Sequence, residues 1–260
     1  MSSSAAEVTG VVASVAAGVA AGVVAGAVAR ERTMPLLPAF AELVLGGVLQ
    51  RGSTVGCVGP AALSLAMAVA AGPSQHGAWV GVAGVGAAGA PSFSVAAAVE
   101  LGVVAERLVL VAEPVAGFAE AQWADVLAAM IDGFDVILMG AGARQVRQTT
   151  ARRLQSRLQS RGAVLVVVGG HRSFGCDLQF TADRPVWEGL GQGHGLATAR
   201  RVQVELSGRR VARARRVEMW LPASAGDMVP GATPLAPLAP LASGRGHRGS
   251  PLMRCPVPAS

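Results

Sequence analysis

The sequence predicts a single α/β domain with a mainly parallel central sheet, flanked by helices, and a C-terminal antiparallel extension. Two observations carry this prediction: short, almost continuously apolar runs alternate with helical stretches, and the helices stop after residue 177. Strands that are buried on both faces of a parallel sheet have this continuous apolar character. Strict alternation of strand and helix implies right-handed crossovers and helices on both faces of the sheet.

The predicted strands and helix ends follow from local patterns. The strands of the parallel part comprise residues 54–58, 79–83, 108–111, 135–139 and 163–168. Those expected to extend the sheet in antiparallel fashion comprise residues 177–181, 201–206 and 215–221. Glycine favours the left-handed end of a helix, and Ser or Thr favours its start. The expected end glycines are Gly72, Gly102, Gly133 and Gly162, and the expected N-caps are Ser92 and Thr149.

Both ends of the chain differ in composition from the predicted domain, which spans residues 35–222. Residues 8–29 are uncharged, and glycine recurs there every fourth position, a spacing used by membrane helices. The run lacks Leu, Ile and Phe, so we expect residues 1–34 to be an Ala/Gly/Val-rich helix, a poorly ordered segment, or sequence upstream of a true start at Met34, and not a membrane span. Residues 223–260 are rich in Pro, Ala, Gly and Ser, and we expect a disordered tail.

Metal and disulfide chemistry are not indicated. The three cysteines are far apart and form no C-x-x-C pair, and the four histidines share no ligand spacing with them. We therefore expect no metal, no disulfide framework and a reducing cytoplasm.

Charge is distributed unevenly along the chain. All 22 basic residues are arginines; residues 1–139 hold 4 of them against 10 acidic residues, whereas residues 140–216 hold 15 against 4. The second half of the domain is therefore expected to face nucleic acid or an acidic protein. Arg153, Arg157 and Arg161 share one face of a predicted helix, for which a solvated crossover helix is the alternative explanation.

The predicted partner or DNA surface also includes arginines near the C-terminal strands and a tryptophan in a glycine-rich loop over residues 184–195. A bulky side chain on such a loop is suited to docking a partner, although it could equally fold back onto the sheet. The named candidates are Arg147, Arg153, Arg157, Arg161, Arg200, Arg201 and Trp187, extended by Arg209, Arg210, Arg213, Arg215 and Arg216.

The segment from Ser53 to Ala71 has the strand, tight turn and helix order of a phosphate-binding loop, but it lacks the Gly-Lys-Ser/Thr signature. A phosphate loop needs consecutive backbone N–H groups and a lysine that reaches the outer phosphates. Proline has no N–H, leucine stands where the lysine is expected, and the chain contains no lysine that could substitute. The residues of this degenerate turn are Gly59, Pro60, Ala61, Ala62, Leu63 and Ser64.

Several segments, taken in order, resemble the actinobacterial ImuA-type proteins, which are RecA-like accessory factors of damage-induced translesion synthesis. The similarity covers residues 35–222. Its most specific parts are the segment that ends in LVLVAEP at Pro114 and the WEGLGQGHG segment at 187–195. The other segments are GGVLQRGSTVGCVGP at 46–60, MIDGFDVILM at 130–139, RGAVLVVVG at 161–169 and RRVQVELSGR at 200–209.

The resemblance implies a RecA-like P-loop-type fold used as a scaffold in a mutasome. Its partners would be an ImuB-type polymerase-like protein and an error-prone replicative-type polymerase. Catalytic features of active RecA relatives do not carry over: the strand ending at Ala83 has no glutamate, the strand ending at Met139 has no following acid, and Asp135 precedes that strand. We therefore expect no enzymatic activity and no cofactor.

Two alternatives stay open at this point. Gly84, Gly86 and Gly89 match G-x-G-x-x-G after a predicted strand, and Glu113 is expected to close the next strand, as in a dinucleotide-binding oxidoreductase. A SulA-like inhibitor of cell division shares the degenerate RecA-like core. Serine hydrolysis is not indicated, because G-x-S-x-G is absent and Ser173 misses its spacing by one residue.

Overall fold

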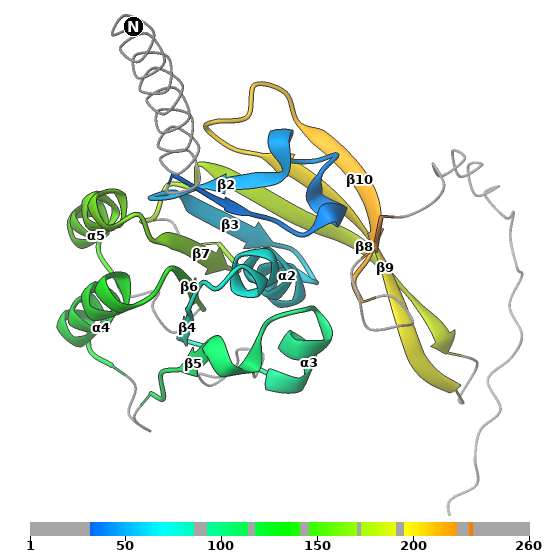
Figure 1. Cartoon of the computed structure of the whole chain (residues 1–260), viewed down its shortest axis with the longest axis horizontal. Helices are drawn as coiled ribbons and strands as arrows, with labels where there is room; N and C mark the ends of the chain where they lie inside the picture. The colour runs from blue at the N-terminus through cyan, green and yellow to red at the C-terminus, as the bar shows by residue number, and fades with distance from the viewer. Residues whose placement is uncertain are drawn as a thin grey trace, which may run out of the picture.

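A nine-stranded mixed sheet forms the centre of the part of the chain that the computed structural model describes, and helices cover both of its faces (Figure 1). The described residues are 32–85, 93–113, 118–140, 146–170, 173–190, 195–222 and 229–230. The strand order is β11-β10-β9-β8-β3-β7-β6-β4-β5. Neighbours from β8 through to β5 are parallel, and those from β8 to β11 are antiparallel. The predicted α/β class with its antiparallel extension is therefore confirmed.

The strands of the parallel part lie close to their predicted positions. They are β3 (Thr54–Val58), β4 (Val80–Ala83), β5 (Leu108–Leu110), β6 (Val136–Met139) and β7 (Val164–Val168). The antiparallel part consists of β8 (Leu178–Leu190), β9 (Gly195–Ser207), β10 (Arg215–Trp220) and β11 (Val229–Pro230). A separate antiparallel pair is formed by β1 (Thr33–Pro35) and β2 (Val48–Gln50).

One predicted pairing was wrong. Residues 177–181 were expected to join the sheet antiparallel, but β8 pairs with β3 in parallel, with Val55 opposite Leu178. The reason is that a loop, and not a helix, makes the crossover: Gly169 N donates to Cys57 O and Asp177 N donates to Thr54 O, both at 2.8 Å. The loop thus returns along the length of β3, and the antiparallel order begins only at β9.

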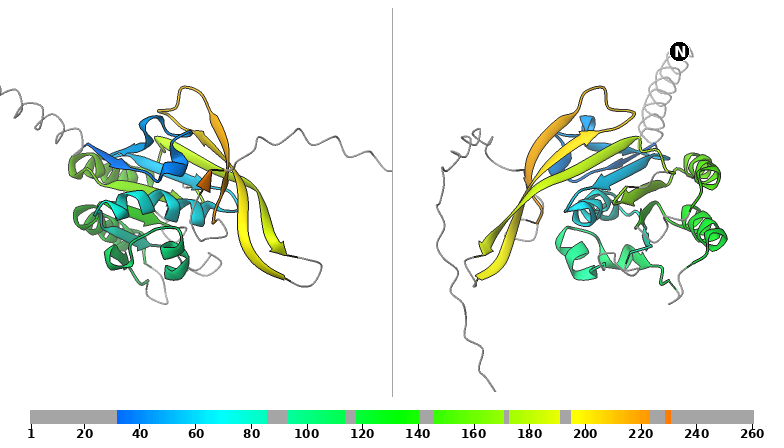
Figure 2. Two further views of the ribbon diagram at one scale, coloured as in Figure 1. Left: turned by 45° about the vertical axis from the view of Figure 1, so that its right-hand side comes forward. Right: turned by 180° about the vertical axis from the view of Figure 1, so that it is seen from behind.

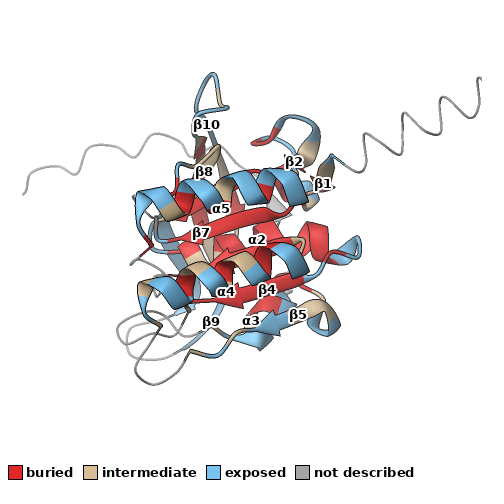
Figure 3. Cartoon of the chain, turned by 90° about the vertical axis from the view of Figure 1, so that its left-hand side faces the viewer, coloured by how far each residue is buried: buried red, intermediate tan, exposed pale blue. Residues whose placement is uncertain are grey.

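The two faces of the sheet carry separate cores. Helices α4 (Glu120–Gly133) and α5 (Gln148–Arg161) cover one face, with their buried residues toward the sheet and their exposed residues outward (Figure 3). Helix α2 (Ala62–Gln75), the short helix α3 (Val95–Glu100) and the β1–β2 pair cover the other face. Alternate strand residues serve the two cores: Val136 and Leu138 face one, Ile137 and Met139 the other. Three short 3₁₀ turns lie at Pro38–Phe40, Leu45–Gly47 and Ala105–Arg107.

The edge strand β5 departs from the expected burial. Val109 and Leu110 are 36% and 45% exposed, whereas β4, β6 and β7 are buried throughout. The continuous apolar character of this run therefore does not reflect burial on both faces. In the described residues β5 has a sheet neighbour on one side only.

The helix-end predictions had mixed outcomes. Gly162 is left-handed at the end of α5, and Gly102 has a φ of 95° just after α3, as predicted. Gly72 instead lies inside α2, where a Cβ would approach Pro35 O to 2.6 Å, so glycine there admits close packing of β1. Gly133 is the last residue of α4 and is not left-handed.

The N-caps also differ from prediction. Helix α5 begins at Gln148 with Arg147 as its N-cap, so Thr149 lies inside the helix and caps nothing. Ser92 lies outside the described residues; the N-cap of α3 is Ser94, whose Oγ accepts from Ala97 N at 3.2 Å.

The predicted terminal segments fall mostly outside the described residues, including the whole uncharged run at 8–29. Within the tail predicted to be disordered, Val229–Pro230 forms the short strand β11 on β10, so the prediction does not hold for these two residues. None of the helices in the described ranges combines the length and apolar composition needed to cross a bilayer.

Candidate functional site

The turn after β3 is tightly closed against a neighbouring strand. Gly59 has a φ of 97°, and a Cβ built on it would lie 2.1 Å from Ala182 O of β8. Pro60 and Ala61 follow, and α2 then starts without a side-chain N-cap. Leu63, where a phosphate loop would carry its lysine, is partly buried and packs against the core. The turn therefore brings a backbone carbonyl, and no cation, to the place where phosphates would bind.

The neighbouring strand ends hold no acidic group in the described residues. Strands β4 and β6 end at Ala83 and Met139, which are both fully buried. After them the two loops converge, so that a Cβ on Gly140 would lie 2.3 Å from Gly84 O. This close backbone contact leaves no room for a side chain at position 140.

Asp135 lies at the opposite end of the sheet, as predicted, and has a structural role. Its Oδ1 is 3.1 Å from Arg51 Nη1, and its Oδ2 accepts from Trp79 N at 3.0 Å. The carboxylate therefore ties the start of β6 to the residues that precede β3 and β4. It is too distant along the strand to act at the Gly59 turn.

The predicted arginine stripe on α5 is largely used to join α5 to α4. Asp132 of α4 accepts from Arg157 Nε at 2.9 Å and from Arg161 Nε at 3.0 Å, and Arg147 Nε lies 2.9 Å from Glu120 Oε2. The hydrogen bond from Arg157 is the main cause that lowers the pKa of Asp132 from 3.8 to about 2.

Arg153 is exposed on α5 and borders a shallow cavity of about 470 Å³ between the two helices. Its neighbours in the stripe, Arg157 and Arg161, are already paired with Asp132. The stripe is therefore less available to phosphates than its sequence suggests.

Most predicted arginines of the antiparallel part are also paired with acids. Arg201 lies 3.3 Å from Glu218, Arg216 pairs with Glu205, and Arg209 and Arg210 both lie 3.3 Å from Asp177. Arg213 and Arg215 are exposed. Four of the predicted arginines in this region are therefore already paired with acidic side chains of the same chain.

Arg200 is held differently. Its guanidinium lies 4.9 Å from the centroid of the Trp187 ring, and its Nε donates to Leu221 O at 2.8 Å. Burial lowers the pKa of this guanidinium. In the described part of the chain no carboxylate lies within ion-pair distance of it.

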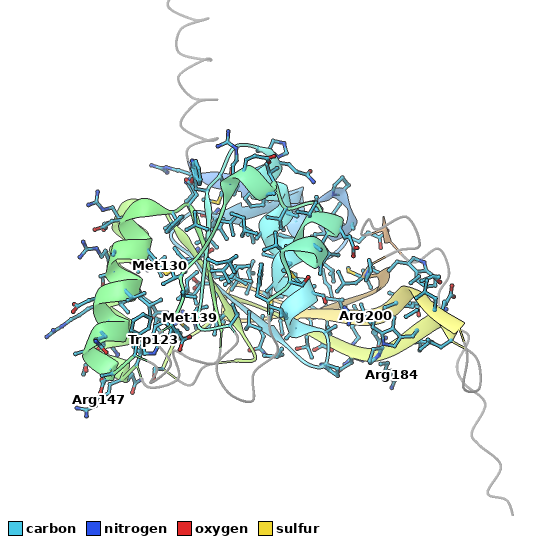
Figure 4. All side chains as sticks on the ribbon, turned by 90° about the horizontal axis from the view of Figure 1, so that it is seen from below. Trp123, Met130, Met139, Arg147, Arg184 and Arg200 are labelled. Carbon is cyan, nitrogen blue, oxygen red and sulfur yellow. The ribbon has the colours of Figure 1, made fainter. Side chains whose placement is uncertain are left out.

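Trp187 is not on a loop as predicted. It lies within β8, directly opposite Arg200 of β9, in a hairpin that extends beyond the body of the sheet. Figure 4 shows Arg184 and Arg200 on this hairpin, at the opposite side of the molecule from Arg147. The candidate residues therefore form two separate groups, one on α5 and one on the hairpin.

The described residues include only part of the glycine motif on which the dinucleotide-binding alternative depends. Gly86 and Gly89 lie outside the described residues, and Glu113 follows β5 by three residues and does not close it. No group of three or more metal-ligating side chains occurs in the described ranges.

The comparison with known proteins places this chain in a family. The family model described as the MT3502 N-terminal domain matches residues 42–173, half of the chain. The chain is also 34% identical over 82 residues to the uncharacterized protein Rv3395c of Mycobacterium tuberculosis, a stretch that covers 32% of this chain and 38% of that protein. The matched stretch thus spans well under half of that relative. The matched family range runs from before β3 to the crossover loop after β7 and includes the closed Gly59 turn, α4 and α5. The chain belongs to the MT3502 N-terminal domain family.

Proposed function

We propose that this chain is a non-catalytic, RecA-like accessory protein of the ImuA type, which acts in the cytoplasm as an adaptor of damage-induced translesion DNA synthesis. In this role it joins an ImuB-type polymerase-like protein and an error-prone replicative-type polymerase. The order of the segments that resemble ImuA-type proteins supports the proposal, because they fall on β3 and its turn, β5, β6, β7 and the β8–β9 hairpin.

The closed Gly59 turn is the observation that carries the non-catalytic part of the proposal. A triphosphate needs a row of free N–H donors and a cation. Here Pro60 has no N–H, and the carbonyl oxygen of Ala182 presses on Gly59 from β8. A carbonyl dipole directed at this turn would repel a phosphate oxygen. Supplying a lysine would not remove that obstacle.

An adaptor needs binding surfaces and no catalytic centre. The ion pairs of the described residues agree with this, because they connect segments of the fold. Six of the described carboxylates form ion pairs with arginines of other segments of the chain. DNA is a secondary candidate partner through the exposed arginines of the predicted surface that form no ion pair in the described residues, namely Arg153, Arg213 and Arg215.

The test measures binding of the purified full-length chain to a purified ImuB-type protein by titration calorimetry, in parallel with Mg²⁺–ATP, NAD and a single-stranded oligonucleotide. A second sample lacking residues 223–260 shows whether the tail contributes. We expect saturable binding to the ImuB-type protein and no heat with either nucleotide. Binding or turnover of ATP that is lost in a Gly59 variant would refute the non-catalytic assignment, and absence of binding to the ImuB-type protein would refute the adaptor role.

A further inference from the structure

The outer halves of β8 and β9 form a projecting ribbon, here called the arm and defined as residues 183–190 and 195–201. Both strands are 13 residues long, whereas strands β3 to β7 have at most 5. Figures 1 and 2 show the arm extending away from the helices. All residues of 183–190 and of 195–198 are exposed. No described element covers this part of the sheet.

The two faces of the arm differ in charge. Trp187 is opposite Arg200, and strand alternation puts Thr198 on the same side as Arg200. Leu196 follows beyond the register shift between Glu188 and Leu190, at the outer end of β9. We call this side, together with Leu196 at its outer end, the front face. The carboxylates of the arm are on the back face, because Glu188 is opposite Ala199 and Asp183 is opposite Gln203. The front face is therefore apolar and cationic, with no acid among its described residues.

The front face holds large exposed apolar side chains. Leu196 is 76% exposed and Trp187 is 44% exposed. Contiguous apolar surface on a projecting element is typical of protein interaction sites, and Trp and Arg are the residues most enriched at the energetic centres of interfaces.

The base of the arm is hydrogen-bonded to the residues that follow β10. Arg200 N donates to Pro222 O at 2.9 Å, and Leu221 N donates to Arg200 O at 2.7 Å. The side chain of Arg200 adds its bond to Leu221 O. Gly189 packs so closely on β9 that a Cβ would lie 2.0 Å from Leu196 O. A surface that is ordered in advance loses less conformational entropy on binding.

We infer that the front face of the arm is the surface that docks the polymerase-like partner, through a partner pocket that is apolar and bordered by at least one carboxylate. The apolar part of that pocket would accept Trp187 and Leu196. The carboxylate would pair with Arg200, the half-buried guanidinium that has no acidic partner within the described residues. The inference rests on the proposed function, since it takes its partner from there.

A single-stranded nucleic acid fits this face less well. Bases stack on aromatic rings, but one side of the Trp187 ring faces Arg200, and Leu196 offers no ring. On the back face the exposed apolar side chain of Val186 is also aliphatic. Phosphates on the back face would meet the carboxylates of Asp183 and Glu188.

The experiment uses the full-length chain and the purified ImuB-type protein in titration calorimetry. The front-face variants are Leu196→Glu and Trp187→Ala. Val186→Glu is the matched control on the back face, and Leu45→Glu, at a leucine 82% exposed on a distant 3₁₀ turn, is the control on the body. Circular dichroism and thermal unfolding establish that each variant is folded.

We expect the front-face variants to weaken binding by about tenfold or more, and both controls to stay within about twofold of the unchanged chain. Unchanged affinity in Leu196→Glu and Trp187→Ala overturns the inference while the adaptor role stands. Failure of the unchanged chain to bind overturns the adaptor role and the inference with it. If the front-face variants lose affinity for a single-stranded oligonucleotide and not for the protein, the surface is a nucleic-acid site and the inference is wrong.

Discussion

Gly59 and Ala182 are in backbone contact: a Cβ built on Gly59 would lie 2.1 Å from the carbonyl oxygen of Ala182. The contact joins the turn after β3 to the middle of β8, although the two residues are far apart in the sequence. Both the spacing and the left-handed φ of 97° require glycine at this position.

The first prediction is that Gly59→Ala destabilises the fold by about 3 kcal/mol or more, because backbone strain and a steric clash add. Gly77→Ala is the matched control, since Gly77 has nearly the same φ of 96°, and a Cβ at this position would meet nothing within 4 Å among the described residues. It should cost only the strain, about 1 kcal/mol. Urea unfolding measures the free energy of unfolding of both variants. Equal decreases would show that the structure accommodates a Cβ next to Ala182 O without a steric cost.

The second prediction concerns Gly72, which lies inside α2. Replacing a helical glycine by alanine normally stabilises a helix by about 1 kcal/mol. We expect Gly72→Ala to destabilise instead, by about 1 to 3 kcal/mol, because the new Cβ would approach Pro35 O to 2.6 Å. Gly133→Ala, at the end of α4 with open space around it, should gain about 0.5 kcal/mol. A gain from both variants in thermal unfolding would contradict the close packing of β1 on α2.

The third prediction is a pH dependence that originates at Asp132. The folded-state pKa of Asp132 is lowered from 3.8 to about 2 by Arg157 and Arg161, so its stabilising effect is present above about pH 4 and is lost as the pH falls through 2. Unfolding free energies measured between pH 5 and pH 2 should therefore depend less on pH in Asp132→Asn than in the unchanged chain. Asp125→Asn, at an exposed acid on the same helix that is in no ion pair among the described residues, is the control. The same slope for Asp132→Asn and the unchanged chain would mean that the ion pairs are not formed in solution.

The fourth prediction is that restoring the missing lysine does not restore nucleotide binding. Leu63→Lys, and also the double variant Pro60→Gly/Leu63→Lys, should still bind Mg²⁺–ATP more weakly than about 1 mM, because Ala182 O continues to close the turn. Calorimetry measures the affinity, and the unchanged chain is the reference. Micromolar binding by either variant would show that only side chains are missing from the turn.

Local patterns were sufficient to predict the elements of the parallel sheet. The strand predicted at 54–58 matches β3, because a short buried strand followed by Gly-Pro has few other solutions. The arm was missed because residues 184–195 are rich in glycine and were predicted as a loop, and because an exposed ribbon leaves no burial pattern in the sequence. The pairing of Trp187 with Arg200 is a cross-strand contact, which residue spacing does not specify.

The candidate site was predicted less completely than the fold, for a related reason. The arginine stripe on α5 was visible in the sequence, but its use was not, because Asp132 lies 25 and 29 residues away from Arg157 and Arg161. The sequence alone does not distinguish an arginine that pairs with a neighbouring helix from an arginine that is free to bind a ligand. The degenerate turn was recognised because it depends on residue types at adjacent positions, whereas its closure by Ala182 depends on the path of β8.

Strand β8 carries both Ala182, which closes the Gly59 turn, and Trp187, which lies on the arm five positions further along. Between these two residues the pairing of β8 with β9 shifts register, from Asp183 to Val186, and Arg184 has a φ of 49°. A movement that reopened the turn would have to displace the first part of β8, and this irregularity separates that part from the arm. Substitutions on the arm can therefore change partner binding while the turn stays closed.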